Sequence, residues 1–187
     1  MKKKIVIIGG VAGGATAATR LRRLSEEDEI ILFEKGEYIS FANCGLPYHV
    51  GGTIKNREDL LLQTVDGMSD QYGLDIRNFS EVTEINPENK TVSVTNSQTK
   101  ESYVESFDQL IISTGAKAIV PPITGLKDAK NVFSLRNIPD MDQVKAYIES
   151  HNVQRATIVG GGFIGLEMME NLVELGIEVH LVEMSEQ

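Results

Sequence analysis

The only cysteine of the chain, Cys44, is the residue best suited to redox chemistry, because a thiol can act as a nucleophile and exchange electrons. It stands in residues 40–48, which read Ser-Phe-Ala-Asn-Cys-Gly-Leu-Pro-Tyr. Asn43 is a favoured helix N-cap and Pro47 suits a first helical turn, so the pattern predicts Cys44 at a helix N-terminus. Backbone N–H groups and the helix dipole favour a thiolate there. The alternative is a buried structural cysteine, the more common situation for a free thiol.

A glycine-rich stretch near the N-terminus predicts a first dinucleotide site. Residues 4–8 form an apolar strand, residues 12–24 have helical spacing, and residues 30–33 form another apolar strand that ends at Glu34. In a Rossmann unit the glycines let the backbone approach a pyrophosphate, and the acid accepts hydrogen bonds from ribose hydroxyls. Val11 departs from the fingerprint, because it occupies the position of the middle glycine. The residues expected at this site are Gly9, Gly10, Val11, Ala12, Gly13, Gly14, Glu34 and Lys35.

A second dinucleotide site is predicted by a complete G-x-G-x-x-G at residues 160–165. It lies between a strand at 156–159 and a helix at 166–175, and a further strand at 178–182 ends at Glu183. That order of elements is far more specific than the glycines alone. An acid in this place favours NADH over NADPH, because a 2′-phosphate would meet its negative charge. The expected contacts are Gly160, Gly162, Phe163, Ile164, Gly165 and Glu183.

The intervening residues complete an α/β fold with two Rossmann-like, parallel-sheet nucleotide-binding units. We expect a third parallel strand at 74–79, antiparallel strands at 91–95 and 102–107, and a returning strand at 110–113. Thr114 and Gly115 follow that strand and are placed to close over the first dinucleotide. The predicted domains are 1–120, with a β insertion at about 88–110, and 121–187, with Pro121-Pro122 as the linker and a helix at 140–150.

The composition argues against other classes of function. The 187 residues carry a formal net charge of −9, which disfavours non-specific binding to nucleic acid or to an anionic membrane. No apolar run is long enough to cross a bilayer, and no metal site is predicted. One cysteine cannot form an intrachain disulfide and suits a reducing compartment, so we expect a cytoplasmic protein.

These motifs together resemble the single-cysteine branch of the FAD-dependent pyridine nucleotide-disulfide oxidoreductases, and most closely coenzyme A disulfide reductases, including those fused to a rhodanese domain. The resemblance covers essentially the whole chain and rests on the residues 9–14, 40–48, 135–137 and 160–167. It implies FAD in the first unit, NADH or NADPH in the second, and a mixed disulfide between Cys44 and coenzyme A. It also implies a homodimer in the complete enzyme.

The resemblance assigns further site residues. Those expected to contact the cofactors are Asn43, Val82, Thr114, Gly115 and Arg136, and those expected to contact coenzyme A are Thr16, Arg20, Arg23, Ser40 and Asn43. Arg20 and Arg23 lie three apart on one helix face and can meet phosphates, although a solvated basic face is an equally good interpretation.

Two other interpretations stay open at this point. NADH peroxidases and water-forming NADH oxidases cycle one cysteine through sulfenic acid, but they carry a histidine in the first glycine-rich turn, where this chain has Ala12. His49 is near Cys44 in the sequence, yet most such histidines are simply hydrogen-bonded and partly buried. The other interpretation is a nucleotide-binding fragment that is inactive by itself, because the second Rossmann unit stops after its second strand.

Overall fold

The computed structural model describes residues 2–186, apart from the side chain of Lys127. These residues form two compact units, and the predicted α/β class with parallel sheets and a small antiparallel sheet is confirmed. The first unit contains the residues up to Phe41 together with Leu61–Ala116. The second contains Ala42–Leu60 together with the residues from Lys117 onward. The segment that carries Cys44 is therefore grouped with the residues that follow Lys117 in the chain.

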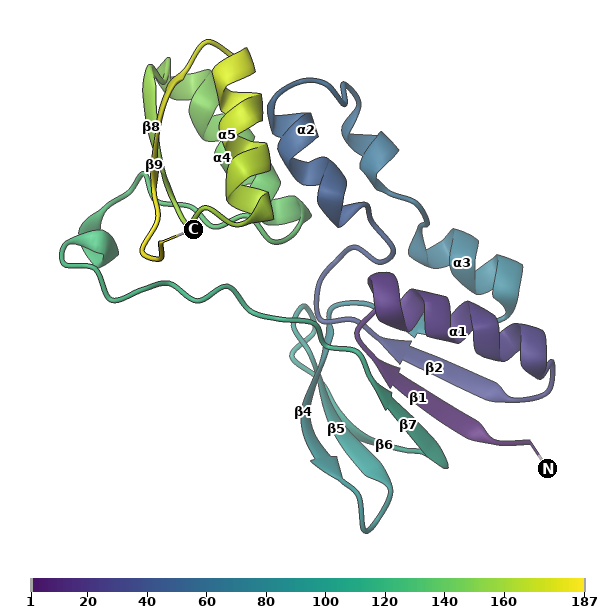
Figure 1. Cartoon of the computed structure of the whole chain (residues 1–187). Helices are drawn as coiled ribbons and strands as arrows, with labels where there is room; N and C mark the ends of the chain where they lie inside the picture. Colours follow the sequence, from purple (N-terminus) through teal and green to yellow (C-terminus); the bar gives the residue numbers. More distant parts are fainter. Residues whose placement is uncertain (1, 187) are drawn as a thin grey trace. The chain divides into compact units, whose positions relative to one another are not determined.

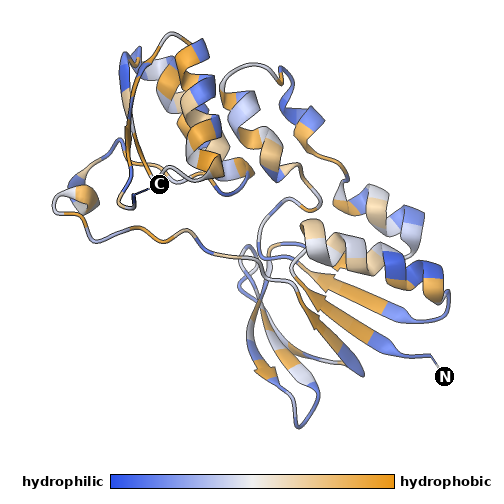
Figure 2. Cartoon of the chain, in the orientation of Figure 1, coloured by the Kyte–Doolittle hydropathy of each residue, from blue (hydrophilic) through white to orange (hydrophobic). Residues whose placement is uncertain are grey.

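The first unit is built on a four-stranded parallel sheet in the order β3-β2-β1-β7 (Figure 1). Its strands are β1 (Lys4–Ile8), β2 (Glu29–Phe33), β3 (Asp75–Arg77) and β7 (Gln109–Ile112). Figure 2 shows β1 and β2 as almost continuously hydrophobic. Such strands are expected when both faces of a parallel sheet are covered.

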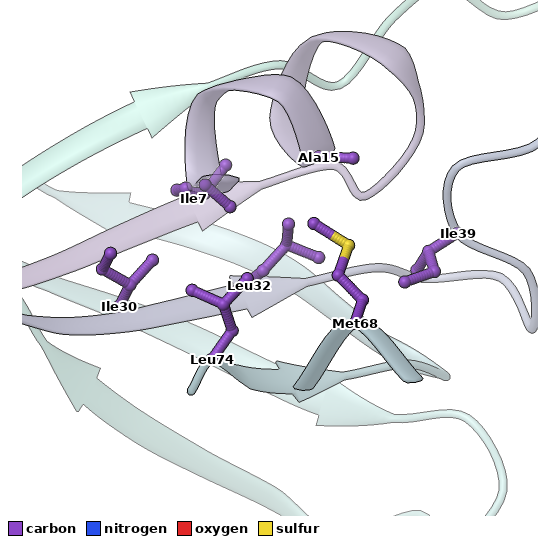
Figure 3. Close-up of a cluster of buried hydrophobic side chains, with 8 residues drawn as sticks. Ile7, Ala15, Ile30, Leu32, Ile39, Met68 and Leu74 are labelled. Atoms are coloured by element: carbon purple, nitrogen blue, oxygen red, sulfur yellow. The ribbon is translucent and has the colours of Figure 1, made fainter. Parts of the chain in front are cut away.

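Helices cover one face of this sheet. They are α1 (Ala12–Leu24) and α3 (Val65–Tyr72), which begins at the N-cap Thr64 and ends at the left-handed Gly73. Alternate strand residues point toward these helices, because successive side chains of a strand face opposite sides. Figure 3 shows the resulting core, which contains Ile7, Ala15, Ala18, Ile30, Leu32, Ile39, Met68 and Leu74.

An antiparallel sheet covers the other face. Its strands are β4 (Ser80–Asn86), β5 (Thr91–Asn96) and β6 (Ser102–Ser106). Val92 and Val94 of β5 pack against the strand residues that face away from the helices. This sheet starts at Ser80, whereas the insertion was predicted to start at about residue 88. The difference arises because the sequence analysis did not predict the strand β4. A bulge between Val82 and Glu84 breaks the apolar alternation of that strand.

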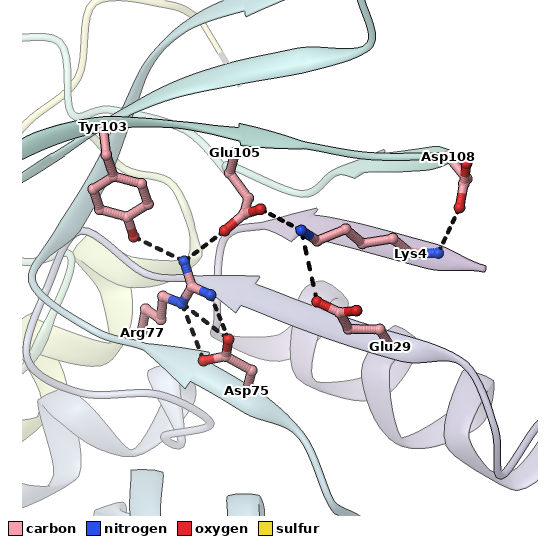
Figure 4. A network of polar contacts seen from close by, with 7 residues as sticks. All are labelled: Lys4, Glu29, Asp75, Arg77, Tyr103, Glu105 and Asp108. Atoms are coloured by element: carbon pink, nitrogen blue, oxygen red, sulfur yellow. Dashed lines mark hydrogen bonds and ion pairs between the residues drawn. The ribbon is translucent and has the colours of Figure 1, made fainter. Parts of the chain in front are cut away.

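A polar network joins the antiparallel sheet to the strands β1 and β3 of the parallel sheet (Figure 4). The carboxylate of Glu105 on β6 pairs with Lys4 of β1 and with Arg77 of β3, the latter at 2.8 Å. Arg77 also pairs with Asp75. Burial acts to raise the pKa of Glu105, but the hydrogen bonds from Lys4 and Arg77 outweigh it and lower the pKa. The charged carboxylate of Glu105 therefore helps to hold the antiparallel sheet against the parallel sheet.

The second unit has a two-stranded parallel sheet of β8 (Arg155–Val159) and β9 (Glu178–Val182). Its longer helices are α4 (Ile138–His151) and α5 (Phe163–Glu174), and α4 is capped by the Asn137 side chain, which accepts from the Asp140 N–H at 2.9 Å. The same unit contains the short α2 (Leu46–Val50) and the 3₁₀ turns η1 (Asn43–Gly45), η2 (Arg57–Leu60) and η3 (Leu126–Asp128). Within residues 2–186, no helix has the length and apolar character needed to cross a bilayer.

Candidate functional site

Cys44 lies in the 3₁₀ turn η1 and is exposed. The prediction that Asn43 caps a helix is wrong, because Asn43 is the first residue of that turn and Gly45 precedes the five-residue α2. A cap is defined by backbone dihedral angles, which residue preference only biases. A Cβ on Gly45 would lie 2.5 Å from the end of the Leu60 side chain, so a larger residue at this position would require that side chain to shift. The thiol is accessible, and the buried structural alternative is excluded.

His49 is buried, with 4% of its surface exposed. Its Nδ1 lies 2.8 Å from the carbonyl oxygen of Ile54. Because a carbonyl can only accept, Nδ1 carries the hydrogen in this contact. The interpretation of His49 as a buried, hydrogen-bonded residue therefore agrees with the structure, and a role as base for Cys44 gains no support.

The first glycine-rich turn is fastened to the end of β2. The Gly9 N–H donates to the Phe33 carbonyl at 2.8 Å, and the Gly10 N–H donates to Oε2 of Glu34 at 2.7 Å. The other carboxylate oxygen of Glu34 accepts from the Gly36 N–H at 2.8 Å. Each carboxylate oxygen has a second lone pair, so Glu34 can hold this turn and still accept a ribose hydroxyl.

Glycine is needed at two positions of this turn. Gly9 has a φ of +102°, and a Cβ there would overlap the Ser113 carbonyl oxygen. A Cβ on Gly14 would overlap the carbonyl oxygen of Gly9. Gly10 has a different constraint, because its Cβ would lie 2.9 Å from both Ile39 and Leu32. The fingerprint glycines thus allow strand, turn and helix to approach each other closely.

The N-terminus of α1 suits an anion. Val11 is its N-cap and makes no side-chain cap, and the first turn of the helix contains no acidic residue. Ala12 and Gly13 are exposed there. Unpaired N–H groups and the positive helix end favour a phosphate group, so these residues fit the pyrophosphate of a dinucleotide. Valine at the middle-glycine position is compatible with this geometry.

Two residues support this turn in a way that the sequence did not predict: Ser113 was not assigned to any site, and Ser40 was assigned to coenzyme A alone. Ser113 lies against Gly9, and its hydroxyl occupies the space that a Cβ on Gly13 would need. Ser40 has a φ of +44°, which is unusual for a residue with a side chain, and its N–H donates to the Gly10 carbonyl at 3.0 Å. Neither contact can be predicted from a sequence motif, because each one joins the turn to residues that are distant from it in the sequence.

The remaining predicted residues of the first unit are spread over several elements. Lys35, Thr114 and Gly115 are exposed, and Thr114 lies close to Gly9. Val82 is half-buried in β4 and packs against the core beneath the antiparallel sheet. The structure therefore brings Thr114 to the first turn and places Val82 in the packing between the sheets.

The three arginines of α1 differ in whether their guanidinium groups are hydrogen-bonded within the protein. Arg22 donates to the backbone carbonyls of Tyr72, Gly73, Ser25, Glu26 and Asp28, and so serves the fold. Arg20 and Arg23 are exposed, as is Thr16, one helical turn before Arg20. Neither of these two guanidinium groups makes a hydrogen bond or ion pair with any described residue. They are available for a ligand.

The second glycine-rich turn repeats the geometry of the first. The Gly160 N–H donates to the Val182 carbonyl at 2.8 Å, and the Gly161 N–H donates to Oε2 of Glu183 at 2.7 Å. The N–H groups of Ser185, Gly161 and Met184, in that order of effect, hold the pKa of Glu183 below its usual range. A Cβ on Gly165 would overlap the carbonyl oxygen of Gly160, in the same way that a Cβ on Gly14 would overlap the carbonyl oxygen of Gly9.

The N-terminus of α5 is also open to an anion. Gly162 is the N-cap, no side chain caps the helix, and no acidic residue lies in its first turn. Among the described residues, nothing lies within 4 Å of a Cβ built on Gly162. Phe163 is 88% exposed and Ile164 is 55% exposed. Arg136 lies just before α4, where its backbone N–H donates to the Asp140 carboxylate at 2.9 Å.

The profile of the family described as pyridine nucleotide-disulphide oxidoreductase matches residues 3–187. A coenzyme A disulfide reductase of Staphylococcus haemolyticus is 42% identical over 185 residues, which are 99% of this chain and 41% of that protein. The crystal structure of reduced Bacillus anthracis CoADR-RHD superimposes with a TM-score of 0.98 at 60% identity, over 100% of this chain and 34% of that one.

A NAD-dependent persulfide reductase from A. fulgidus has a TM-score of 0.93 and 33% identity, over 98% of this chain and 34% of that one. The present chain thus spans 41% of the length of the Staphylococcus haemolyticus relative. The match of the family profile covers nearly the whole sequence. This chain belongs to the pyridine nucleotide-disulphide oxidoreductase family.

Proposed function

We propose that the complete protein reduces coenzyme A disulfide with NADH, through FAD held at the first glycine-rich turn and through Cys44. The observation that carries the proposal is an exposed cysteine in a chain with two glycine-rich turns, each hydrogen-bonded to the acid at the end of the next strand. The names of the relatives support the substrate class. Cys44 has no second thiol within these 187 residues, so a mixed disulfide with an external thiol is the oxidised form that we propose for it, in preference to a sulfenic acid.

The proposed reaction consumes one NADH, one proton and one coenzyme A disulfide, and gives NAD⁺ and two coenzyme A thiols. The Cys44 thiolate attacks one sulfur of the substrate, which breaks the sulfur–sulfur bond and releases a first coenzyme A thiolate. Two electrons then reduce the mixed disulfide, which returns the Cys44 thiolate and releases the second coenzyme A. FAD, when bound, supplies the two-electron relay between the nicotinamide and the mixed disulfide.

The residues of this chain bind and orient the reactants. The turn at Gly9–Gly14 and the carboxylate of Glu34 are proposed to hold FAD, and the turn at Gly160–Gly165 with Glu183 to hold NADH. Arg20, Arg23 and Thr16 form an exposed face on α1 that is suited to the phosphates of coenzyme A. Ser40 and Asn43 flank the thiol in the sequence and are proposed to contact the same substrate.

A coenzyme A persulfide is a related substrate, because reduction of its sulfur–sulfur bond would release hydrosulfide and one coenzyme A thiol. The similarity to a persulfide reductase supports this variant. Peroxide or oxygen reduction ranks lower. Ala12 offers no imidazole in the first turn, and His49 is already hydrogen-bonded to Ile54. We further propose that the enzyme is a cytoplasmic homodimer.

The test uses the full-length flavoprotein and its Cys44→Ser variant. Wild-type protein should oxidise NADH when coenzyme A disulfide is added, with two thiols formed for each NADH. The variant should keep its flavin and lose this activity, because a serine hydroxyl cannot form the mixed disulfide. Disulfide reduction at the wild-type rate in the serine variant would show that another group carries the reaction. Hydrosulfide released from coenzyme A persulfide distinguishes the two substrates.

A further inference from the structure

The segment Ala42–Leu60, which carries Cys44, has little regular structure of its own. It contains the three-residue turn η1, the five-residue α2 and the four-residue turn η2. Helices of this length are not stable in isolation, because the cost of nucleation is not recovered over one or two turns. The geometry of the segment must therefore come from the elements on which it packs, and these are α4 and α5 of the second unit.

One anchor is a close approach between α2 and α5. Gly51 follows α2, and a Cβ on this residue would overlap the Oδ1 of Asn171. Asn171 is 1% exposed, and its Nδ2 donates to the Glu167 carbonyl at 2.8 Å. Its Oδ1 is buried and has no hydrogen-bond partner among residues 2–186. A buried amide oxygen without a hydrogen-bond partner is unusual. Here the Asn171 side chain limits how closely the end of α2 can approach α5.

Two further anchors join the segment to α4. Arg57 of η2 binds Asp142 in a two-pronged ion pair, with Nε–Oδ1 at 2.9 Å and Nη2–Oδ2 at 2.8 Å. A bidentate pair of this type fixes orientation as well as distance. Lys145, one turn further along α4, donates from Nζ to the His49 carbonyl at 3.3 Å. The segment is thus held at η2, at α2 and at Gly51.

We infer that Asn171 and the Arg57–Asp142 pair are positioning residues for Cys44, which set the placement of the thiol through the packing of α2 and η2 on α4 and α5. This inference rests on the proposed role of Cys44 in the reaction. Neither contact involves the thiol directly, so these residues are expected to affect the reaction only through the position of the Cys44 sulfur. A small displacement of a reacting atom lowers the rate of the chemical step more than it lowers binding.

The decisive comparison uses two adjacent glycines in the full-length holoenzyme. Gly51→Ala adds a methyl group that must push against Asn171, at a φ of −72° that alanine accepts. Gly52→Ala adds a methyl group with nothing described within 4 Å, at a φ of +84° that strains alanine. The first variant disturbs the contact with α5, and the second disturbs only the local backbone.

The readouts are the alkylation rate of Cys44 by iodoacetamide, after dithiothreitol treatment and desalting, and the steady-state constants for coenzyme A disulfide. We expect Gly51→Ala to change the alkylation rate by about threefold or more and to lower kcat about tenfold with little change in KM. Gly52→Ala should leave both near the wild-type values even where it lowers Tm.

The ion pair provides an independent test. Arg57→Ala and Asp142→Ala should each shift the alkylation rate, the double variant should be no worse than either single one, and Arg57→Lys should restore part of the effect. Glu178→Ala, which removes the exposed Glu178–His180 pair of the same unit, is the control. If Gly51→Ala and Arg57→Ala lower Tm but leave alkylation and kcat unchanged, the positioning role is wrong. Failure of the proposed function is seen separately, as disulfide reduction that survives Cys44→Ser.

Discussion

The carboxylate of Glu183 accepts a hydrogen bond from the backbone N–H of Gly161 at 2.7 Å. The same contact, with the same length, joins Glu34 to Gly10 in the first unit. In both places the acid at the end of the second strand fastens the glycine-rich turn that follows the first strand. The acid thus shapes the turn, in addition to its proposed contact with the ribose of a nucleotide.

This double role leads to a prediction about the choice of nucleotide. The backbone N–H groups that lower the pKa of Glu183 keep it charged at neutral pH, so it should repel a 2′-phosphate. We expect NADH to be preferred over NADPH, by about fivefold because the group is exposed and screened. Glu183→Gln, which keeps the length and removes the charge, should reduce the preference in kcat/KM. A wild-type preference for NADPH would show that Glu183 does not read the ribose.

Two glycines of the second turn should behave differently when a methyl group is added. Gly165→Ala places it on the Gly160 carbonyl, so the turn must open and both Tm and NADH affinity should fall. Gly162→Ala places it in open space at the N-cap of α5, where the pyrophosphate is expected. Its Tm should stay at the wild-type value while the KM for NADH rises about tenfold or more. Equal losses of Tm in both variants would contradict this assignment.

The arginines of α1 provide a matched set for the proposed coenzyme A site. Arg20→Ala and Arg23→Ala should each raise the KM for coenzyme A disulfide about two- to fivefold, the effect of an exposed ionic contact, and leave Tm unchanged. Arg22→Ala should instead destabilise the fold by about 1–3 kcal/mol, because several backbone carbonyls lose their donor. Thermal unfolding and initial rates separate the two effects. An unchanged KM in the Arg20 and Arg23 variants would move the phosphate contacts elsewhere.

The Glu105 network predicts how stability depends on pH. The folded-state pKa of Glu105 lies below its ordinary value of 4.5, so the unfolded chain takes up the proton first as the pH falls. The contribution is therefore complete above about pH 5 and is lost as the pH drops through the folded-state pKa. Glu105→Gln should lower Tm at pH 7 and lose less stability on acidification than wild type. Glu101→Gln, at an exposed position just before β6, is the control.

Much of the fold follows from local sequence patterns. The apolar runs identified β1, β2, β8 and β9, and the predicted bounds of α1 and β9 agree with the structure. These elements are easy to recognise because their burial repeats over the whole element. The strand β4 was missed because its bulge places Val82 and Ile85 out of strict alternation.

The site was less predictable, because its residues are joined by contacts between distant parts of the chain. The glycines and acids were found from spacing alone, but the support of Ser113 for the first turn has no sequence signature. Asn43 was assigned as a cap from its residue type, whereas the backbone forms a 3₁₀ turn there. The packing of the Cys44 segment with α4 and α5 depends on Arg57–Asp142 and Gly51–Asn171, pairs more than 80 residues apart.

The measurement that tests the central claim most directly is the intact mass of the full-length protein before and after dithiothreitol, following incubation with coenzyme A disulfide and gel filtration. We predict that dithiothreitol lowers the mass by one coenzyme A, and that Cys44→Ser shows no such loss. An unchanged mass in the wild-type protein, or an equal loss in the serine variant, would contradict a mixed disulfide between Cys44 and coenzyme A.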